Sequence, residues 1–575
     1  MAKRIMESVG IFFATLLVIS QPAFADDKGN VTGSFKKVQA QQKKTDALPQ
    51  VLIKNVNIFD GKSEKLAVGQ AVLVEGSLIK DLLLLMGKAK SPVIMKDGKT
   101  TRTHGEKTET VDLSRRRTMM RFTSIICVLI LSSILLLGDS TLGLAKKTPG
   151  YNNKIPDAIL TPDTVETRIG TLRFFDGIPT KQTASLVFDS LDFHRGVETF
   201  LNGMPAASLE AIRRGMASIG ARNSNQIVIF DKLMDSNSLF LTGNTDTVYA
   251  TAWLDLKKDG PTVVEIPSGA GPGTVNDAFF RFVVDMGAPG PDKGKGGKYL
   301  ILPPGYDGDV PNGYFVAKST SWGNWLILRG FLVDGKPDAA NKMWTESLKV
   351  YSLAAAANPP AMEFISGSGN PFNTIHANDF EFFEELHAVL KREPIGMLDP
   401  ELRGLFASVG VQKGKPFAPD ERMKKLLTDA VAVGNATARA IFWQHRDESS
   451  FLYENSYWKR GFIGGSYQYL KDEGMGGRDW DARVHFYYFA TVNTPAMAEE
   501  IVGGGSQYAW GYLDKSGNYL DGGKTYRMNL PKDFPVKQFL SIVVYDSQTR
   551  SELQTSQPYP SKNNVRDKMI ANDDG

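Results

Sequence analysis

The sequence contains a single cysteine, Cys127, among 575 residues. That residue lies in an apolar run, so the rest of the chain has no thiol for a disulfide, a thiolate metal site or a cysteine nucleophile. The sequence also lacks a His-Glu-x-x-His zinc motif and a Gly-x-Ser-x-Gly nucleophile elbow, and its six histidines are scattered. We therefore expect neither a metal nor a cofactor, while a triad assembled only by folding stays open.

Neither sign of charge is in large excess, because 67 basic residues face 63 acidic ones and the net charge of the chain is only +4. No basic tract with interleaved aromatic residues follows residue 146, so nucleic acid is not an expected partner. The stretch Asp521–Thr525, "DGGKT", resembles a phosphate loop only in part. Asn518 stands where the first glycine should be, and the sequence continues as a strand pattern instead of a helix. We expect no nucleotide site there.

Residues 1–25 have the pattern of a secretory signal peptide. Lys3 and Arg4 are basic, the run Ile11–Ile19 is apolar, and Ala23 and Ala25 form a small-x-small exit. This pattern predicts a periplasmic or secreted protein. A membrane contact is expected only through a signal or anchor segment.

A second segment of the same kind occupies residues 119–145, after a run of arginines. Its apolar part, Ile125–Leu137, is shorter than the roughly 20 residues that span a bilayer. We favour a second signal peptide, with the exported product beginning at Lys146. Two alternatives stay open, namely a membrane anchor through residues 121–138 and a buried helix of a globular domain.

Residues 26–117 lie between these two segments and begin with a polar leader that is poor in aromatic residues. The run Val51–Lys80 reads as two alternating strands, and it resembles the opening strands of the amidohydrolase superfamily. That family's metal site begins with a His-x-His pair, whereas His104 stands alone here. We interpret this region as a remnant without the chemistry, within a non-globular N-terminal region.

From residue 150 the pattern predicts an α+β fold that is mainly β, with two antiparallel β-sandwich or jelly-roll-like domains. The β-rich domain covers residues 150–335, a helical segment covers 336–450, and a second β-domain covers 451–575. We expect the following helices and late strands: two helices from Ala184, broken at Gly203 and Pro205; helices over Asp338–Leu353, Asn378–Arg392 and Pro419–Trp443, the last with Asp420 as N-cap; and strands over 482–493, 506–514, 523–530 and 536–547.

Five motifs in this part carry a family resemblance: "TGNTDTVYATAWLDLKKDGPTVVEIP", "MGAPGPDKGKGGKYLILPPGY", "NPFNTIHANDFEFFEEL", "KGKPFAPDERMKKLL" and "GGGSQYAWGYLDKSGNYLDGGKTYRMNLP". Over roughly 155–575 they resemble exported bacterial proteins that combine domain of unknown function 1254 with domain of unknown function 1214. The resemblance implies two β-domains with helices, without an established reaction. Such proteins normally continue past "IANDDG", so we expect an open edge in the last sheet, and an oligomer stays open.

The densest polar cluster is "GNTDTVYATAWLD". Along a strand, Asn244 and Asp246 share a face, so they offer an amide and a carboxylate to one ligand, with Tyr249 nearby. The alternative is an Asx turn in which these side chains cap backbone N–H groups. We name Asp246 as a candidate catalytic residue, and Asn244 and Tyr249 as candidate ligand-binding residues.

Two histidines are further catalytic candidates. His376 precedes an acidic helix start, where a loop or core role is the alternative. His485 follows Asp481 and Arg483 at a period of two, which places the three on one sheet face for an acidic or sugar-like ligand, with Tyr487 stacking or bonding. A structural ion pair between Asp481 and Arg483 is the alternative.

Two functions stay open for the whole chain. The first is an exported enzyme, such as a cofactor-independent hydrolase, that acts on a small polar or carbohydrate-like ligand between the β-domains. Its site would lie near Asn244, Asp246, Arg281, Asp285 and His485, with Arg281 and Asp285 as ligand-binding residues. The second is a non-catalytic envelope module for binding or packing. The sequence does not decide whether the protein is an enzyme.

Overall fold

The structure, a computed structural model, describes residues 153–454, 456–500, 506–530, 534, 536–557, 559–567 and 569, and the backbone of strands between residues 14 and 112. The chain forms two compact units, one of residues Ala25–Ile155 and one that joins Met1–Phe24 to Pro156–Gly575. The predicted second signal or anchor segment, 119–145, lies outside the described residues. Within the described part of the chain, no helix has the length and apolar character needed to cross a membrane.

The smaller unit contains two three-stranded sheets, of order β2-β3-β4 and β5-β6-β7. The two strands predicted within Val51–Lys80 are present as the antiparallel pair β2 and β3, and β4 extends them. The bounds are β2 (Gln50–Ile58), β3 (Ala67–Glu75), β4 (Leu78–Asp81), β5 (Met95–Lys96), β6 (Lys99–His104) and β7 (Lys107–Asp112).

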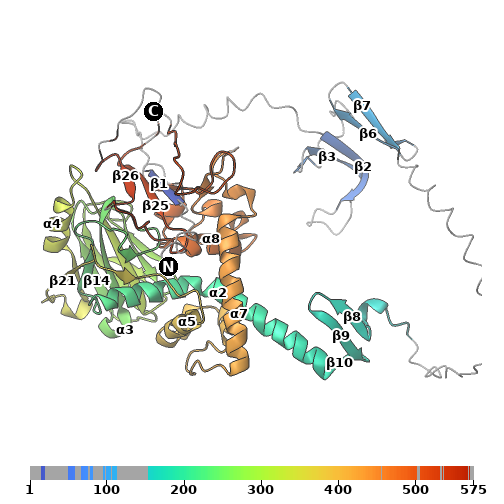
Figure 1. Cartoon of the computed structure of the whole chain (residues 1–575), viewed down its shortest axis with the longest axis horizontal. Helices are drawn as coiled ribbons and strands as arrows, with labels where there is room; N and C mark the ends of the chain where they lie inside the picture. Colours follow the sequence, from blue (N-terminus) through green and yellow to red (C-terminus); the bar gives the residue numbers. More distant parts are fainter. Residues whose placement is uncertain are drawn as a thin grey trace, which may run out of the picture. The chain divides into compact units, whose positions relative to one another are not determined.

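The larger unit is built around a six-stranded sheet of order β16-β15-β19-β13-β11-β21 and a four-stranded sheet of order β18-β17-β14-β20. Figure 1 labels β21 of the first sheet and β14 of the second. Their strands are β11 (Gln226–Ile229), β13 (Thr247–Asp255), β14 (Thr262–Ile266), β15 (Gly273–Asp277), β16 (Phe282–Met286), β17 (Gly297–Leu302), β18 (Phe315–Lys318), β19 (Gly323–Phe331), β20 (Lys349–Ser352) and β21 (Glu363–Ser366). The predicted α+β class is confirmed. The expectation of purely antiparallel sheets is wrong, because β11 pairs with β21, and β17 with β18, in parallel.

Strand alternation gives the six-stranded sheet two different faces. On β13, the side chains at every second position from Val248 to Leu254 belong to a core shared with β14, β17 and β20 of the four-stranded sheet. Tyr249 and Trp253, one position along, belong to the other core, which contains helix residues and the C-terminal part of the chain. The second face of this sheet therefore carries the side chains that meet the helices.

Most of the helices pack on that second face, and the first of them differs from the prediction. We expected a break at Gly203 and Pro205, but α2 (Lys181–Ser218) runs through both (Figure 1). A Cβ on Gly203 would lie 2.9 Å from Leu386 Cδ2, so the absent side chain lets α5 approach closely. The remaining helices are α3 (Leu256–Asp259), α4 (Asp338–Ser347), α5 (Glu381–Arg392), α6 (Pro400–Ser408), α7 (Glu421–Trp443), α8 (Trp480–Phe489) and α9 (Pro495–Ala498).

Helix α7 begins as predicted, because the Asp420 side chain accepts a hydrogen bond from the Met423 N–H at 2.8 Å. The helix predicted over Asp338–Leu353 ends at Ser347. Residues Lys349–Ser352, at the end of the predicted range, form strand β20 instead. Two small sheets complete this part: β8 (Thr164–Thr167), β9 (Gly170–Phe175) and β10 (Ile178–Pro179) form one, and β12 (Ser238–Leu239) and β22 (Phe372–Asn373) form the other.

The C-terminal sheet has the order β23-β24-β1-β25-β26. Its bounds are β23 (Lys459–Arg460), β24 (Gln507–Gly511), β25 (Leu540–Tyr545), β26 (Ser561–Asn563) and β1 (Ala14–Ile19). Strand β1 comes from the segment that the sequence pattern assigns to a signal peptide, and it pairs antiparallel with both β24 and β25. The strand predicted over 523–530 is absent from those residues, and the one predicted over 482–493 is mostly helix α8.

Candidate functional sites

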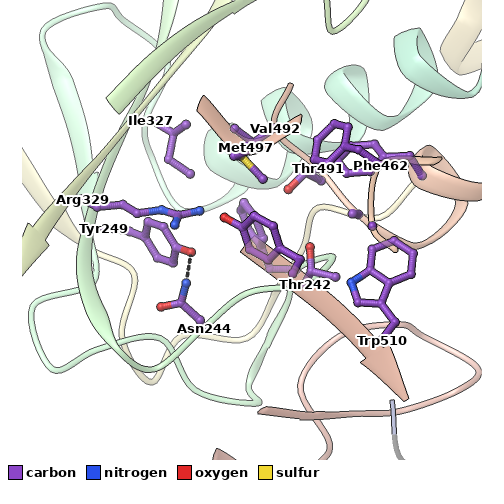
Figure 2. Close-up of a pocket in the computed structure, with 15 residues that line it drawn as sticks. Thr242, Asn244, Tyr249, Ile327, Arg329, Phe462, Thr491, Val492, Met497 and Trp510 are labelled. Atoms are coloured by element: carbon purple, nitrogen blue, oxygen red, sulfur yellow. Dashed lines mark hydrogen bonds between the residues drawn. The ribbon is translucent and has the colours of Figure 1, made fainter. Parts of the chain in front are cut away.

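The strand register places a tyrosine and an arginine together on the helix-facing side of the large sheet. Tyr249 on β13 is the direct cross-strand partner of Arg329 on β19. The guanidinium carbon of Arg329 lies 5.4 Å from the centroid of the Tyr249 ring, a cation–π geometry. Both side chains line a small cavity of about 30 Å³, the Arg329 cavity (Figure 2).

The Arg329 cavity is built from distant parts of the chain. Its remaining lining residues come from the loop before β13, from β19, from the segment after β23, from α8 and the segment after it, and from β24: Phe240, Thr242, Asn244, Ile327, Gly461, Phe462, Phe486, Ala490, Thr491, Val492, Met497, Tyr508 and Trp510. These walls are largely apolar. A space of this volume holds a few small atoms, because one water needs roughly 10–15 Å³ on the same measure.

A second small cavity of about 30 Å³ shares Arg329, Ile327, Val492, Met497 and Tyr508 with the first. It is also lined by the carboxylate of Asp285. The Thr494 hydroxyl lies 2.7 Å from both oxygens of this carboxylate, which share its proton. Burial raises the pKa of Asp285 to about 6.

The polar cluster before β13 folds as an Asx turn. The Asp246 N–H donates to Asn244 Oδ1 at 3.0 Å, and Asn244 Nδ2 donates to the Tyr249 hydroxyl at 2.5 Å. Asp246 is buried, and its Oδ1 accepts from Asn563 Nδ2 at 2.6 Å. Asn244 and Tyr249 thus line the Arg329 cavity, whereas Asp246 bonds to β26.

A buried acid lies close to Asp246. Glu552 is 1% exposed, and neither of its carboxylate oxygens has a hydrogen-bond partner among the described residues. Burial, followed by the charge of Asp246, raises the pKa of Glu552 to about 8. Burial also raises the pKa of Asp246. Glu552 therefore keeps its proton at neutral pH in the folded protein, and the protonation equilibrium of Asp246 shifts in the same direction.

A third and larger space, of about 300 Å³, lies between β16, α6, α8 and the loop before α8. Four cationic side chains line it, against two carboxylates, so we call it the arginine cleft. The cations are Arg281, Lys318, Arg478 and Arg483, and the acids are Asp277 and Asp399. Its other lining residues are mostly aromatic or aliphatic: Pro205, Phe279, Phe280, Phe282, Val283, Thr320, Leu398, Leu402, Tyr467, Gln468, Tyr469, Tyr487 and Asn493.

Arg281 is held at the rim of this cleft by its own turn. Its Nε donates to Asp277 Oδ2 at 2.8 Å, and its Nη2 donates to the Thr320 hydroxyl at 2.9 Å. Asp277 in turn accepts the Arg281 backbone N–H at 2.9 Å through Oδ1. The other acid, Asp399, accepts the Leu402 N–H at 2.9 Å as the N-cap of α6. Both carboxylates therefore have structural partners.

Arg483 lies deeper in the cleft and is 8% exposed. One end of its guanidinium donates to Asn202 Oδ1, and its Nε has no partner among the described residues. Burial lowers the pKa of Arg483 to about 10, which leaves it charged at neutral pH. Beside it, the Tyr487 hydroxyl donates to the Phe280 carbonyl at 3.2 Å.

The predicted residues are thus divided among several places. Arg281, Arg483 and Tyr487 meet in the arginine cleft, and Asn244 and Tyr249 meet in the Arg329 cavity, with Asp285 in its neighbour. No residue predicted as catalytic lines any of these three spaces.

Both candidate histidines are buried among aromatic side chains. His485 is 0% exposed and stacks on Phe442 and Trp510, with ring centroids 4.9 Å and 5.0 Å away. His376 is 2% exposed and makes edge contacts with Phe200 and Phe382. Burial lowers the pKa of His485 to about 3 and that of His376 to about 4, so both are neutral at pH 7.

The shared sheet face that we predicted for Asp481, Arg483 and His485 is wrong. These residues lie on α8, where positions two apart point in different directions. The alternative of an Asp481–Arg483 ion pair is also wrong, because Asp481 pairs with Arg446 at 2.7 Å. Arg329 was not among the predicted residues, although a charged residue in the apolar strand "WLILRGF" is a visible signal in the sequence.

Two family models match the chain. Residues 224–352 match the model described as protein of unknown function (DUF1254), and residues 505–575 match the one described as protein of unknown function (DUF1214). The chain therefore combines these two domains, as the motifs predicted. Both matched regions contribute to the Arg329 cavity, through Tyr249 and Arg329 on one side and through Tyr508 and Trp510 on the other.

No curated protein matches the sequence. Among solved structures, the chain is similar to the crystal structure of the VPA0106 protein from Vibrio parahaemolyticus. The two are 15% identical, with a TM-score of 0.41, and the similarity covers 67% of this chain and 86% of that one.

Proposed function

We propose that this protein binds a small organic anion with an apolar or aromatic body in the arginine cleft. The observation that carries the proposal is Arg483, a buried guanidinium beside a cleft of about 300 Å³, whose Nε has no hydrogen-bond partner among the described residues. Burying a charge without a carboxylate partner is costly, and a ligand carboxylate or phosphate offsets that cost. Volumes from about 300 Å³ are typical of small-molecule sites.

The walls of the cleft define the rest of the ligand. Phe282 and Tyr467 pack edge to face, with ring centroids 5.7 Å apart, and Leu398 and Leu402 add aliphatic surface. A ring or short chain that contacts these residues would leave its charged group near the arginines. We propose binding and not the hydrolysis that the sequence suggested, because the candidate catalytic residues Asp246, His376 and His485 lie outside the cleft.

Thermal unfolding of the full chain with three probes tests this function. Phthalate carries both a ring and carboxylates, inorganic phosphate carries charge alone, and glucose is a neutral sugar. We expect phthalate to raise the unfolding temperature most, phosphate less, and glucose not at all. Stabilisation by glucose alone would replace the anion proposal by a carbohydrate one, and no response to any probe would contradict both.

Variants locate the effect. Arg483→Gln removes the buried charge, and we expect it to weaken phthalate binding about tenfold or more, because the lower end of the 1.5–3 kcal/mol range for a charge-assisted bond corresponds to roughly tenfold. Arg446→Gln is the matched control, because the Arg446 side chain is 84% exposed and, among the residues that the structure describes, pairs only with Asp481. Equal losses in both variants would place binding elsewhere. We also propose that the protein is exported, which the signal-peptide pattern of residues 1–25 supports.

A further inference from the structure

The Arg329 cavity is separate from the arginine cleft, and its polar groups have a common property. Among the described residues, no carboxylate forms an ion pair with Arg329, whose neighbours are the phenol groups of Tyr249, Tyr508 and Tyr545. Burial raises the pKa of Tyr249 to about 12, so this phenol is neutral at pH 7 and does not balance the arginine charge. Among the described residues, no carboxylate therefore balances the guanidinium charge in an ion pair.

The hydrogen bonds of Asn244 settle the direction of the Tyr249 hydroxyl. Asn244 Oδ1 is fixed as the acceptor of the Asp246 N–H, so the other end of the amide is the NH₂ group. That group donates to the Tyr249 oxygen at 2.5 Å. The Tyr249 proton is therefore directed away from Asn244, and the described residues offer it no acceptor. Figure 2 shows this pair beside Arg329.

Trp510 adds a further donor from the opposite wall. It lines the same cavity, it is 2% exposed, and its indole N–H has no hydrogen-bond partner among the described residues. An indole nitrogen donates only, and so does a guanidinium. The cavity is thus lined by donors from both matched domains, and its net charge is positive.

We propose that the Arg329 cavity binds one small monovalent anion, between chloride and formate in size, which accepts bonds from Arg329 and Tyr249. The volume of about 30 Å³ admits such an ion and excludes a larger organic acid. Bound there, the anion links the large sheet to β24 and stabilises the contact between the two domains. This role is independent of the ligand proposed for the arginine cleft.

Thermal unfolding at constant ionic strength tests the proposal. The full chain is kept in sodium gluconate, whose anion is too large for the cavity, and gluconate is replaced stepwise by chloride or by formate. We expect the unfolding temperature to rise and to saturate with each small anion, because a ligand bound only to the folded state stabilises it. A rise that is linear, or that is equal for acetate, formate and a bulky benzoate, would contradict a site of this size.

Two variants assign the effect to this cavity. Arg329→Gln should abolish the saturable rise, whereas Arg446→Gln should keep it. Should Arg329→Gln fail to fold, Trp510→Phe retains the bulk and removes only one donor, and we expect it to weaken the apparent anion affinity severalfold. A bromide-soaked crystal gives an independent readout. Anomalous density in contact with the Arg329 guanidinium supports the proposal, and its absence at saturating bromide overturns it.

Discussion

Tyr249 and Arg329 face each other across β13 and β19, and the arginine lies over the tyrosine ring at 5.4 Å. Their neighbours in sequence, Val248 and Leu328, point into the apolar core between the two sheets. The pairing register therefore determines that a charged side chain leaves the sandwich core and meets the C-terminal domain. A shift by one residue would bury the guanidinium among aliphatic side chains.

The acid Glu552 should make stability depend on pH. The unfolded carboxyl loses its proton near pH 4.5, whereas the folded one keeps it to about pH 8. The folded state binds more protons in this window, so stability falls as pH rises from about 4.5 to 8. We expect Glu552→Gln to gain unfolding temperature over the parent at pH 8 but not at pH 4.5. A difference that is the same at both pH values would contradict the raised pKa.

His485 should act in the opposite direction. Its folded pKa of about 3 lies below the ordinary value of 6.5, so the unfolded state binds more protons between these values and stability falls as pH falls through them. His485→Phe keeps an aromatic ring between Phe442 and Trp510. We expect a smaller loss of stability from pH 6.5 to 4 and unchanged phthalate binding. Loss of phthalate binding in a folded variant would assign His485 to the site.

Two glycine-to-alanine substitutions test how closely α2 packs against α7. A Cβ at Gly196 would lie 2.7 Å from the Ala430 Cβ, so Gly196→Ala forces the two helices apart and should cost about 1–3 kcal/mol. Gly404 in α6 has no atom within 4 Å of a built Cβ, so Gly404→Ala should stabilise by about 0.5–1 kcal/mol. Urea unfolding measures both, and equal effects would contradict the close packing.

Asp277 positions Arg281 at the cleft. Its Oδ2 accepts from Arg281 Nε at 2.8 Å and from the Thr320 hydroxyl at 2.6 Å. Asp277→Asn should weaken this arrangement and lower phthalate affinity severalfold. Thr320→Val, which removes the hydroxyl that bonds to Asp277 and Arg281 but keeps the ion pair between them, should have a smaller effect. Tighter phthalate binding in Asp277→Asn, from lost negative charge alone, would show that positioning of Arg281 matters less than charge.

The α+β class and most β-rich segments could be predicted because strand alternation and turn residues are local signals. Helix α8 could not be predicted, because every residue from Ala482 to Phe489 is buried and no polar face marks the helical period. The aromatic run "VHFYYF" therefore has the composition of a strand. The break expected at Gly203 failed for a related reason, because packing against α5 outweighs local propensity.

The candidate sites were only partly accessible to sequence reasoning. The turn around Asn244 is local, and its hydrogen bonds follow from residues a few positions apart. The partnership of Tyr249 with Arg329 needs the β13–β19 register, and Trp510 joins them only through folding of the C-terminal sheet. In the same way, Arg281 and Arg483 are brought together by a helix that was expected to be a strand.

A crystal of the full chain soaked with phthalate shows whether the arginine cleft is the binding site. We expect density for one phthalate in this cleft, with a carboxylate within hydrogen-bond distance of Arg483 Nε and the ring against Phe282 or Tyr467. Phthalate bound only at other surfaces, or a cleft without phthalate at saturating concentration, would contradict it.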